Sequence, residues 1–520
     1  MYKFKKGLGL LVAAAMLLSL AATGCGSAKT GGGDTAAAVQ SADQTQDSAA
    51  ASTPAASAAQ QLEPVELSWY YLGNTPGEGQ AKVETALGDY LKDKINATVR
   101  FYPLGWDEFH TKTGAMTAAN EPYDITFSPA WIGFADAAAK NSYLDITELF
   151  PKYCPETKKL LGDDFLKGGY YNGKLLAIPT NKEKAHSIGL MVNKQLLDKY
   201  SLDLNSISTI NDLEPMLKTI KDNEPDVIPF MVNSGANIPF LIPQLDYVTG
   251  DDTYGVAAKY GDTKLLCPTE TAEMADAYKL TRDWYLKGYV YKDAATEAAG
   301  GDTKKSQTLE NDGKVFAYVA NLIPQQAANR SNEKVTWVQK QLIKPRISAK
   351  DLGGSMNSIS STSKNPERAL MFLELVNTDK TVNNLIAWGI EGTNYTKVSE
   401  NGIRQDDKSD YVHTNQWIFG NQFLNYLKDT ESPTKWEEFL AFNEEAVPDK
   451  SLGFVFTKTD DVKTEIAAVR LAYSKTYLWT GCQDVDKELP KLIDQLKKAG
   501  VDKIISTVQT EYDAWLASQK

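Results

Sequence analysis

The sequence is poor in the side chains on which most catalytic and metal sites depend. Its 520 residues include three histidines, His110, His186 and His413, and no two of them lie at a metal-ligand spacing. It contains no H-E-x-x-H, no G-x-S-x-G and no acidic run spaced as a calcium loop. We therefore expect no metal, no cofactor and no catalytic residue. Paired carboxylates for glycoside hydrolysis stay open, because an acidic chain of this size has many and no two stand out.

Cysteine is also scarce. Apart from Cys25 the chain has Cys154, Cys267 and Cys482, which are widely spaced and form no C-x-x-C. An odd number cannot all pair within the chain, so buried, unpaired thiols are favoured over a metal site or a nucleophile. Whether two of the three form one bridge stays open.

The chain is acidic, with a formal net charge of −12, and its Lys and Arg residues form no large cluster along the sequence. Proteins that bind nucleic acid need clustered Lys and Arg for the phosphate backbone, so nucleic acid is not expected as a partner.

One motif imitates a phosphate-binding loop. Residues 168–174 have its glycine and lysine spacing, but Leu175 stands where a Ser or Thr should hold Mg²⁺. A phosphate loop also needs a helix N-terminus, whereas Asn172 and Gly173 between two apolar runs favour the turn of a β-hairpin. We predict the hairpin.

The N-terminus has the pattern of an export signal. Lys3, Lys5 and Lys6 precede an apolar run from Leu8 to Leu20, and small residues lead to Cys25. Thirteen apolar residues cover roughly 20 Å as a helix, too short for the ~30 Å hydrocarbon core of a membrane. The sequence Ala-Thr-Gly-Cys resembles a bacterial lipobox, which implies cleavage after residue 24 and lipidation of Cys25. A secretory signal with an incidental cysteine is the alternative.

Residues 25–64 are predicted to be a disordered linker, because they consist mostly of small and polar residues. A flexible coil of about 38 residues spans roughly 35 Å, enough to hold a folded body clear of the membrane surface. We expect the body at the outer face of the cell membrane, held by the lipid anchor only.

The body opens with alternating strands and helices. Strands are predicted at 65–71, 97–102 and 123–127, and helices at 106–119 and 133–140. Val83, Leu87, Leu91 and Ile95 recur every four residues and predict a helix between the first two strands. This βαβαβ order indicates a mostly parallel sheet with helices on both faces.

A second α/β unit follows. Its strands are predicted at 188–192, 227–232, 314–320 and 336–343, and its helices at 194–200, 210–222 and 269–287. A helix is predicted after Pro366, and the C-terminus is predicted to form two helices separated by Gly500. No internal repeat of 20–50 residues is visible.

Five stretches of the body carry a resemblance to a known family. They are Tyr123–Ser128 with Trp131, Asn172–Lys174 with Ala177–Pro179, Met191–Lys194, Trp388–Tyr395, and Leu496–Asp502 with Gln509 and Trp515. Their order across about 450 residues, behind the lipobox, resembles family 1 extracellular solute-binding proteins of ABC transporters. In particular, the body resembles the LipO-like lipoprotein branch common in Gram-positive bacteria.

The resemblance implies an α/β fold of the two-lobed periplasmic-binding-protein type (type II), with a hinge between the lobes and a helical C-terminal region. Lobe 1 would comprise 65–185 and 352–385. Lobe 2 would comprise 186–351, and 386–520 would complete it and form the helical region. The connections between lobes are expected near 184–188, 344–354 and 383–388.

The resemblance also implies a function. A monomeric receptor would trap an oligosaccharide by lobe closure and deliver it to the permease subunits of the transporter. A peptide-binding receptor, a lipoprotein glycosidase and a cell-surface adhesion protein are the alternatives. The identity, linkage and length of the sugar stay open, as do the permease and the role of residues 400–520.

Ligand-binding residues are expected where predicted strands end, since ligands of open α/β sheets bind there. Sugar rings stack on aromatic side chains, and amides bind their hydroxyl groups. Trp131 is the strongest candidate, since family members often carry a stacking aromatic in the loop after Asp-Ile. The other candidates are Tyr70, Tyr71, Trp106, Asn233, Asn321, Trp388 and Tyr395.

Overall fold

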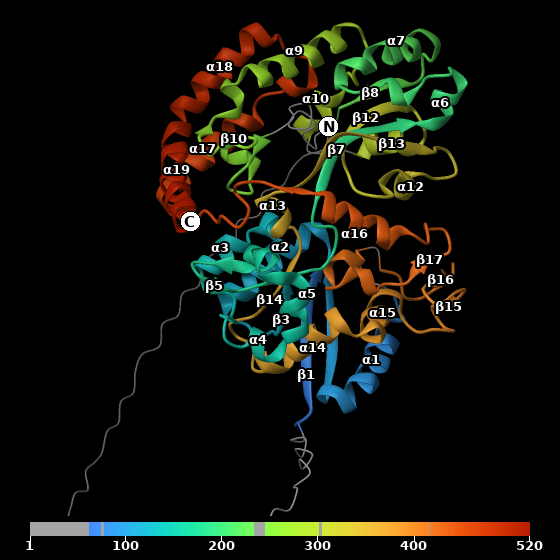
Figure 1. Cartoon of the computed structure of the whole chain (residues 1–520), viewed down its shortest axis with the longest axis vertical. Coiled ribbons are helices and arrows are strands. Elements are labelled where there is room, and N and C mark those ends of the chain that lie inside the picture. Colours follow the sequence, from blue (N-terminus) through green and yellow to red (C-terminus); the bar gives the residue numbers. More distant parts are fainter. Residues whose placement is uncertain (1–61, 74–76, 233–244, 301–303, 414, 520) are drawn as a thin grey trace, which may run out of the picture. The chain divides into compact units, whose positions relative to one another are not determined.

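Two five-stranded sheets organise the part of the chain that the structure, a computed structural model, describes (Figure 1). The described residues are 62–519 apart from 74–76, 233–244, 301–303 and 414. Each sheet has its own hydrophobic core, so the described residues form two α/β lobes, as the sequence predicts.

The sheet of lobe 1 has the strand order β2-β1-β3-β14-β6. Strand β1 (Val65–Leu72) runs parallel to β2 (Ala97–Leu104) and β3 (Ile125–Phe127), which confirms the expected βαβαβ start. Strand β14 (Met356–Ile359) is antiparallel to β3 and to β6 (Ile178–Pro179).

The helices of lobe 1 follow the predicted apolar spacing. In α1 (Gln80–Ile95), Val83, Leu87 and Leu91 are fully buried, and α1 ends at Asn96, whose φ of 44° is left-handed. The remaining helices of this lobe are α2 (Trp106–Ala119), α3 (Phe134–Ala139), α4 (Phe150–Tyr153), α5 (Pro155–Leu166), α14 (Pro366–Thr378) and α15 (Lys380–Trp388).

The hairpin at Asn172 and Gly173 is confirmed. Strands β4 (Tyr170–Tyr171) and β5 (Lys174–Leu175) pair antiparallel, and both turn residues have positive φ, 49° and 76°. This is the pair of conformations that Asn-Gly hairpin turns adopt.

The sheet of lobe 2 is mixed, with the order β18-β13-β7-β12-β8. Its central strand β7 (His186–Asn193) is antiparallel to β12 (Val315–Leu322) and β13 (Trp337–Ile347). Strands β8 (Ile228–Met231) and β18 (Val447–Pro448) run parallel to β12 and β13, respectively.

Helices and a small sheet complete lobe 2. The small sheet consists of β9 (Leu245–Asp246), β10 (Ala257–Lys259) and β11 (Leu265–Leu266). Among the described residues, its helices before β13 are α6 (Lys194–Lys199), α7 (Glu214–Asn223), α9 (Ala272–Leu286), α10 (Ala294–Gly300), α11 (Lys304–Asn311) and α12 (Gln326–Arg330). Helix α13 (Ala349–Leu352) lies in the connection between β13 and β14.

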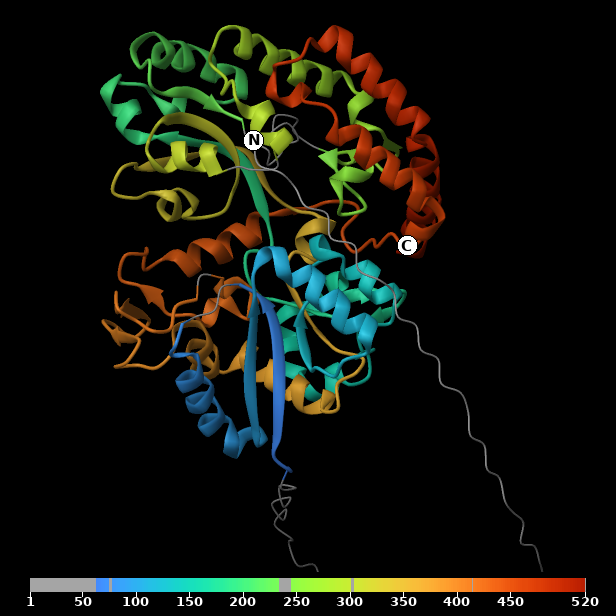
Figure 2. The same ribbon diagram turned by 180° about the vertical axis from the view of Figure 1, so that it is seen from behind.

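The C-terminal region is helical, as expected. Helices α17 (Lys463–Ser474), α18 (Val485–Lys498) and α19 (Val501–Ser518) join the core of lobe 2, and Gly500 separates the last two with φ 92°. Figures 1 and 2, seen from opposite sides, show these helices along one flank of lobe 2.

Residues 386–445 differ from the expected division, which assigned them to lobe 2. Tyr411, Ile418 and Phe419 are buried in the core of lobe 1, and Asn357 of β14 donates a hydrogen bond to the Ile418 carbonyl at 2.9 Å. This segment also holds β15 (Tyr395–Lys397), β16 (Gly402–Gln405), β17 (Leu427–Lys428) and α16 (Lys435–Glu445).

The chain therefore returns to the lobe 2 sheet between α16 and β18 rather than near 383–388. Alternating strands and helices do not encode which of two sheets a segment joins. Strands β6 and β7 belong to different sheets, as do β13 and β14, so the chain also passes between the sheets at these two places.

Across the described ranges, no helix combines the length and the apolar character needed to cross a membrane.

Candidate functional site

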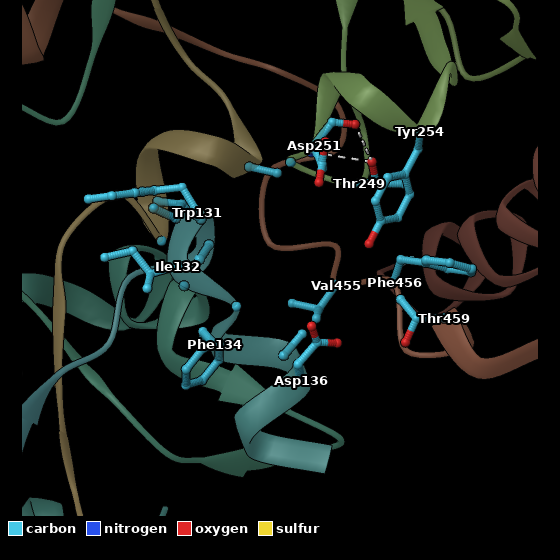
Figure 3. Close-up of a pocket in the computed structure, with 18 of the residues that line it drawn as sticks. Trp131, Ile132, Phe134, Asp136, Thr249, Asp251, Tyr254, Val455, Phe456 and Thr459 are labelled. Carbon is cyan, nitrogen blue, oxygen red and sulfur yellow. Dashed lines mark hydrogen bonds between the residues drawn. The ribbon is translucent and has the colours of Figure 1, made fainter. Parts of the chain in front are cut away.

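A pocket of about 770 Å³ is lined by residues from both lobes and from the connection between them (Figure 3). Lobe 1 contributes Leu72, Phe109, residues 130–136, Lys167, Gly168 and Tyr170. Lobe 2 contributes residues 249–254 and 453–456, Thr459 and Arg470, and the connection contributes Ala349, Leu352 and Gly353. Its volume lies within the range of roughly 300–1,000 Å³ that is typical of ligand sites.

Trp131 is the largest exposed aromatic side chain of the lobe 1 wall. It follows β3 in a short 3₁₀ turn, Ala130–Ile132, and 45% of its surface is exposed. Its indole Nε1 donates a hydrogen bond to the Gly354 carbonyl at 2.8 Å, and its ring contacts the edge of Phe127. The polar atom of the ring is thus bound to the connection between the lobes, while much of the ring surface is open to the pocket.

Tyr254 projects into the pocket from the lobe 2 side (Figure 3). It ends the 3₁₀ turn Asp252–Tyr254, which is capped by the Asp251 carboxylate through the Thr253 N–H at 2.8 Å. Burial and the nearby Asp251 raise the pKa of the Tyr254 hydroxyl, so it stays protonated at neutral pH. Val455 and Phe456 form the adjoining wall.

Charged groups of both signs line the same pocket. Asp136 extends from α3, and Arg470 forms an ion pair with Asp251 at 2.6 Å. Lys167, also in the lining, pairs with Asp164 at 2.8 Å. Aromatic faces surrounded by carboxylates, hydroxyls and a guanidinium suit a ligand that has both apolar C–H faces and hydroxyl edges.

Two charge pairs lie close to the connections between the lobes, and one of them, Arg346 with Asp449, is buried. His186 at the start of β7 lies 2.9 Å from Asp351 of α13, and Asp351 raises the pKa of this imidazole. Arg346 of β13 binds Asp449, just after β18, at 2.5 and 2.9 Å. The first pair joins two of the connections, and the second pair joins β13 to the residue that follows β18.

Most of the other predicted ligand residues lie away from this pocket. Tyr71 is buried in the core of lobe 1, and Trp388 and Tyr395 are buried in a small cluster beside β16. Tyr70 stacks on Tyr102 with ring centroids 4.5 Å apart, and Asn321 is exposed in β12. That these five residues contact the ligand stays a prediction, and their positions in the structure do not support it.

Three further predicted residues have no described side chain. Trp106 begins α2, but its side chain lies outside the described part, as do Asn233 and Cys25 altogether. Their predicted roles stay predictions.

Sequence reasoning missed the lobe 2 side of the pocket. Tyr254, Phe456 and Arg470 belong to loops and a helix that no strand-end rule singles out. The Gly250-Asp251-Asp252 run before Tyr254 is a loop signal, but it does not indicate that the loop faces the other lobe.

Within the described residues no three His, Cys, Asp or Glu side chains come together in a way that could hold a metal ion. Two α/β lobes, three connections and a pocket lined from both sides define the class of two-lobed solute-binding proteins.

Comparison with known proteins gives the family. Residues 73–383 match the family described as bacterial extracellular solute-binding protein, and the chain belongs to it. Residues 450–517 match a second family, described as a domain of unknown function (DUF3502).

The chain is similar to a carbohydrate ABC transporter substrate-binding protein of Streptococcus pneumoniae serotype 4. The two are 30% identical over 465 residues, which cover 87% of this chain and 91% of the relative.

Solved structures show the same fold. The N-glycan transport solute-binding protein NgtS of S. pneumoniae has a TM-score of 0.77 and 28% identity, covering 88% of this chain and all of that one. Further NgtS structures contain Man1GlcNAc and Man5GlcNAc. A solute-binding protein of Bifidobacterium longum infantis has a TM-score of 0.61 at 16% identity, covering 87% of this chain and 99% of that one.

Proposed function

We propose that this protein is a receptor that captures an oligosaccharide in the pocket between its lobes and presents it to the permease of an ABC transporter. The exposed face of Trp131, held at the pocket by its bond to Gly354, is the observation that carries the proposal. An aromatic ring that is partly exposed in a pocket offers a platform for the C–H face of a sugar ring. The NgtS relatives with bound mannose–GlcNAc oligosaccharides support this ligand class.

The position of Trp131 also suggests how binding is transmitted. Its indole binds Gly354 in the connection between β13 and β14, so a sugar stacked on the ring touches the segment about which the lobes would move. A ligand that contacts both walls stabilises the closed arrangement by its differential affinity, and the permease would recognise that arrangement.

The remaining parts of the proposal concern location and turnover. The lipobox-like sequence ending at Cys25 supports a lipid anchor that holds the protein at the outer face of the cell membrane. Membership in a solute-binding family supports binding without chemical change of the glycan.

A thermal-shift screen tests the ligand class. The purified protein is heated with single members of a panel that contains Man1GlcNAc, Man5GlcNAc, other oligosaccharides and short peptides. A ligand at 100 times its dissociation constant adds about 2.7 kcal/mol to the free energy of unfolding, so a binder raises the melting temperature clearly. A shift with one glycan class is expected. Shifts with peptides alone, or release of sugar products, would contradict the proposal.

A further inference from the structure

The region matched as a domain of unknown function makes one wall of the ligand pocket. It begins with residues 450–456, of which Gly453, Phe454, Val455 and Phe456 line the pocket, and Thr459 and Arg470 also face it. The rest of the region packs into the core of lobe 2 through residues such as Val469, Leu496 and Val508, all fully buried. The region is thus fixed to lobe 2 and reaches the pocket along one edge.

Arg470 of α17 joins this region to the loop that carries Tyr254. Its Nη2 lies 2.6 Å from the Asp251 carboxylate, and its Nε donates a hydrogen bond to Thr253 Oγ1 at 2.8 Å. The guanidinium also lies 5.1 Å from the centre of the Tyr254 ring, within cation–π range. One planar side chain therefore contacts three residues of a single short loop.

This loop is also held by close packing. Gly255, which ends the 3₁₀ turn, has φ 71°, and a Cβ at this position would lie 3.3 Å from each of Val469, Tyr473 and Val501. Helices α17 and α19 thus pack tightly against the loop, and a side chain at 255 would require these neighbours to shift by a few tenths of an ångström.

The ion pair itself contributes little to stability. The Arg470 and Asp251 side chains are 48% and 34% exposed, and water screens the attraction between charges at such positions. The ion pair lies at the base of the loop from which the Tyr254 side chain points into the pocket (Figure 3).

We propose that residues 450–517 are the specificity-determining wall of the pocket, with Arg470 as the residue that positions Tyr254 against the ligand. This inference rests on the proposed function and adds to it a role for the region whose family description gives none. The ligand would lie between Trp131 on lobe 1 and the wall formed by Tyr254 and Phe456 on lobe 2.

A matched pair of variants separates positioning from general stabilisation. Arg470→Ala removes the contacts to the Tyr254 loop. Lys503→Ala removes another ion pair of the same length, between Lys503 and Glu465 at 2.6 Å, which joins α19 to α17 outside the pocket lining. The paired carboxylates, Glu465 and Asp251, are 22% and 34% exposed, so the two changes are similar in kind.

Amide hydrogen exchange of the ligand-free protein tests the positioning. In Arg470→Ala we expect the amides of Thr253, Tyr254 and Gly255 to exchange about fivefold faster or more than in the wild type, because the loop loses its anchor. In Lys503→Ala these amides should exchange at the same rate as in the wild type. Equal rates in all three proteins would overturn the positioning role.

Titration with Man1GlcNAc, Man5GlcNAc and kestose tests the specificity. For the glycan that the wild type binds, we expect Arg470→Ala to weaken affinity about tenfold and Lys503→Ala to leave it unchanged. The affinity of Arg470→Lys should lie between those of the wild type and Arg470→Ala, because lysine keeps the positive charge but lacks the planar guanidinium group. Unchanged affinity in Arg470→Ala overturns this inference and leaves the proposed function standing. If the wild type binds no glycan, the proposed function fails and the specificity role fails with it.

Discussion

His413 makes the stability of lobe 1 depend on pH. The side chain is 5% exposed and lies among the rings of Tyr71, Tyr411 and Phe419, with centroid distances of 5.6, 5.0 and 4.9 Å. Burial in this apolar surrounding lowers the pKa of the imidazole to about 3. In the unfolded chain the same imidazole has a pKa near 6.5.

The sign of the effect follows from the two pKa values. Between about pH 6.5 and pH 3 the unfolded chain binds a proton at His413 and the folded chain does not, so acidification favours unfolding. Each pH unit in this window costs about 1.4 kcal/mol of stability. From pH 7 to pH 5 the loss amounts to about 2 kcal/mol.

His186 has the opposite effect. Asp351 raises the pKa of this imidazole, so its contribution to stability is fully present below about pH 6.5 and is lost as the pH rises through the folded value. The pH dependence of the wild type alone therefore mixes two opposed contributions.

Comparing the wild type with His413→Gln isolates the contribution of His413 to the pH dependence of stability. Glutamine does not titrate and can still pair with the Tyr71 hydroxyl, which lies 3.4 Å from His413 Nε2. Urea unfolding followed by circular dichroism is measured at pH 7 and pH 5 for both proteins. We expect the wild type to lose about 2 kcal/mol more than the variant between the two pH values. Parallel losses in the two proteins would refute the reasoning.

Two further predictions concern backbone packing and buried charge. In β7 a Cβ on Gly189 would lie 2.1 Å from the Lys340 carbonyl oxygen, so Gly189→Ala should lower the urea midpoint. The control Gly114→Ala, in open space within α2, should raise stability by about 0.5–1 kcal/mol, and a similar change in both would contradict the packing argument. Burial raises the pKa of Asp449 to about 7 even beside Arg346, so in Arg346→Ala this acid should take up a proton, and the lost hydrogen bonds should cost about 1–3 kcal/mol in urea unfolding. A loss below about 1 kcal/mol would show that Arg346 is dispensable.

Much of the fold could be predicted from local patterns. The stripe from Val83 to Ile95 gave α1 because one face of a helix must be apolar to pack on a sheet. Asn172 and Gly173 gave the hairpin because few residues adopt positive φ at two successive positions. Both patterns depend only on residues that are near one another in the sequence.

The assignment of segments to the two lobes was harder to predict from the sequence. Tyr411 and Phe419 join the core of lobe 1 through contacts with strands more than 300 residues earlier in the chain, such as Tyr71 of β1. Their local sequence shows that they are apolar but not which core they enter. The same limit explains why lobe 2 residues of the pocket were missed.

The expectation that ligands bind where strands end identified the pocket residue Trp131 but missed the pocket residues of lobe 2. Trp131 follows β3 directly, where ligands of α/β sheets bind. Tyr254 lies on a loop that contacts Arg470, more than 200 residues later, and no local pattern shows this contact. Tyr71, also at a strand end, faces the core instead, because alternate residues of a strand point to opposite faces.

The central claim is that Trp131 binds a glycan in the pocket between the lobes. Calorimetric titration of the wild type, Trp131→Ala and Trp436→Ala with the glycan that gives the largest thermal shift tests it most directly. Trp436 is a matched control, since it is half-buried and its Nε1 donates to the Asn425 carbonyl at 2.9 Å, but it lies outside the pocket lining. We predict one site per chain, equal affinity in the wild type and Trp436→Ala, and about tenfold weaker binding or none in Trp131→Ala. Equal affinity in all three proteins would contradict the account.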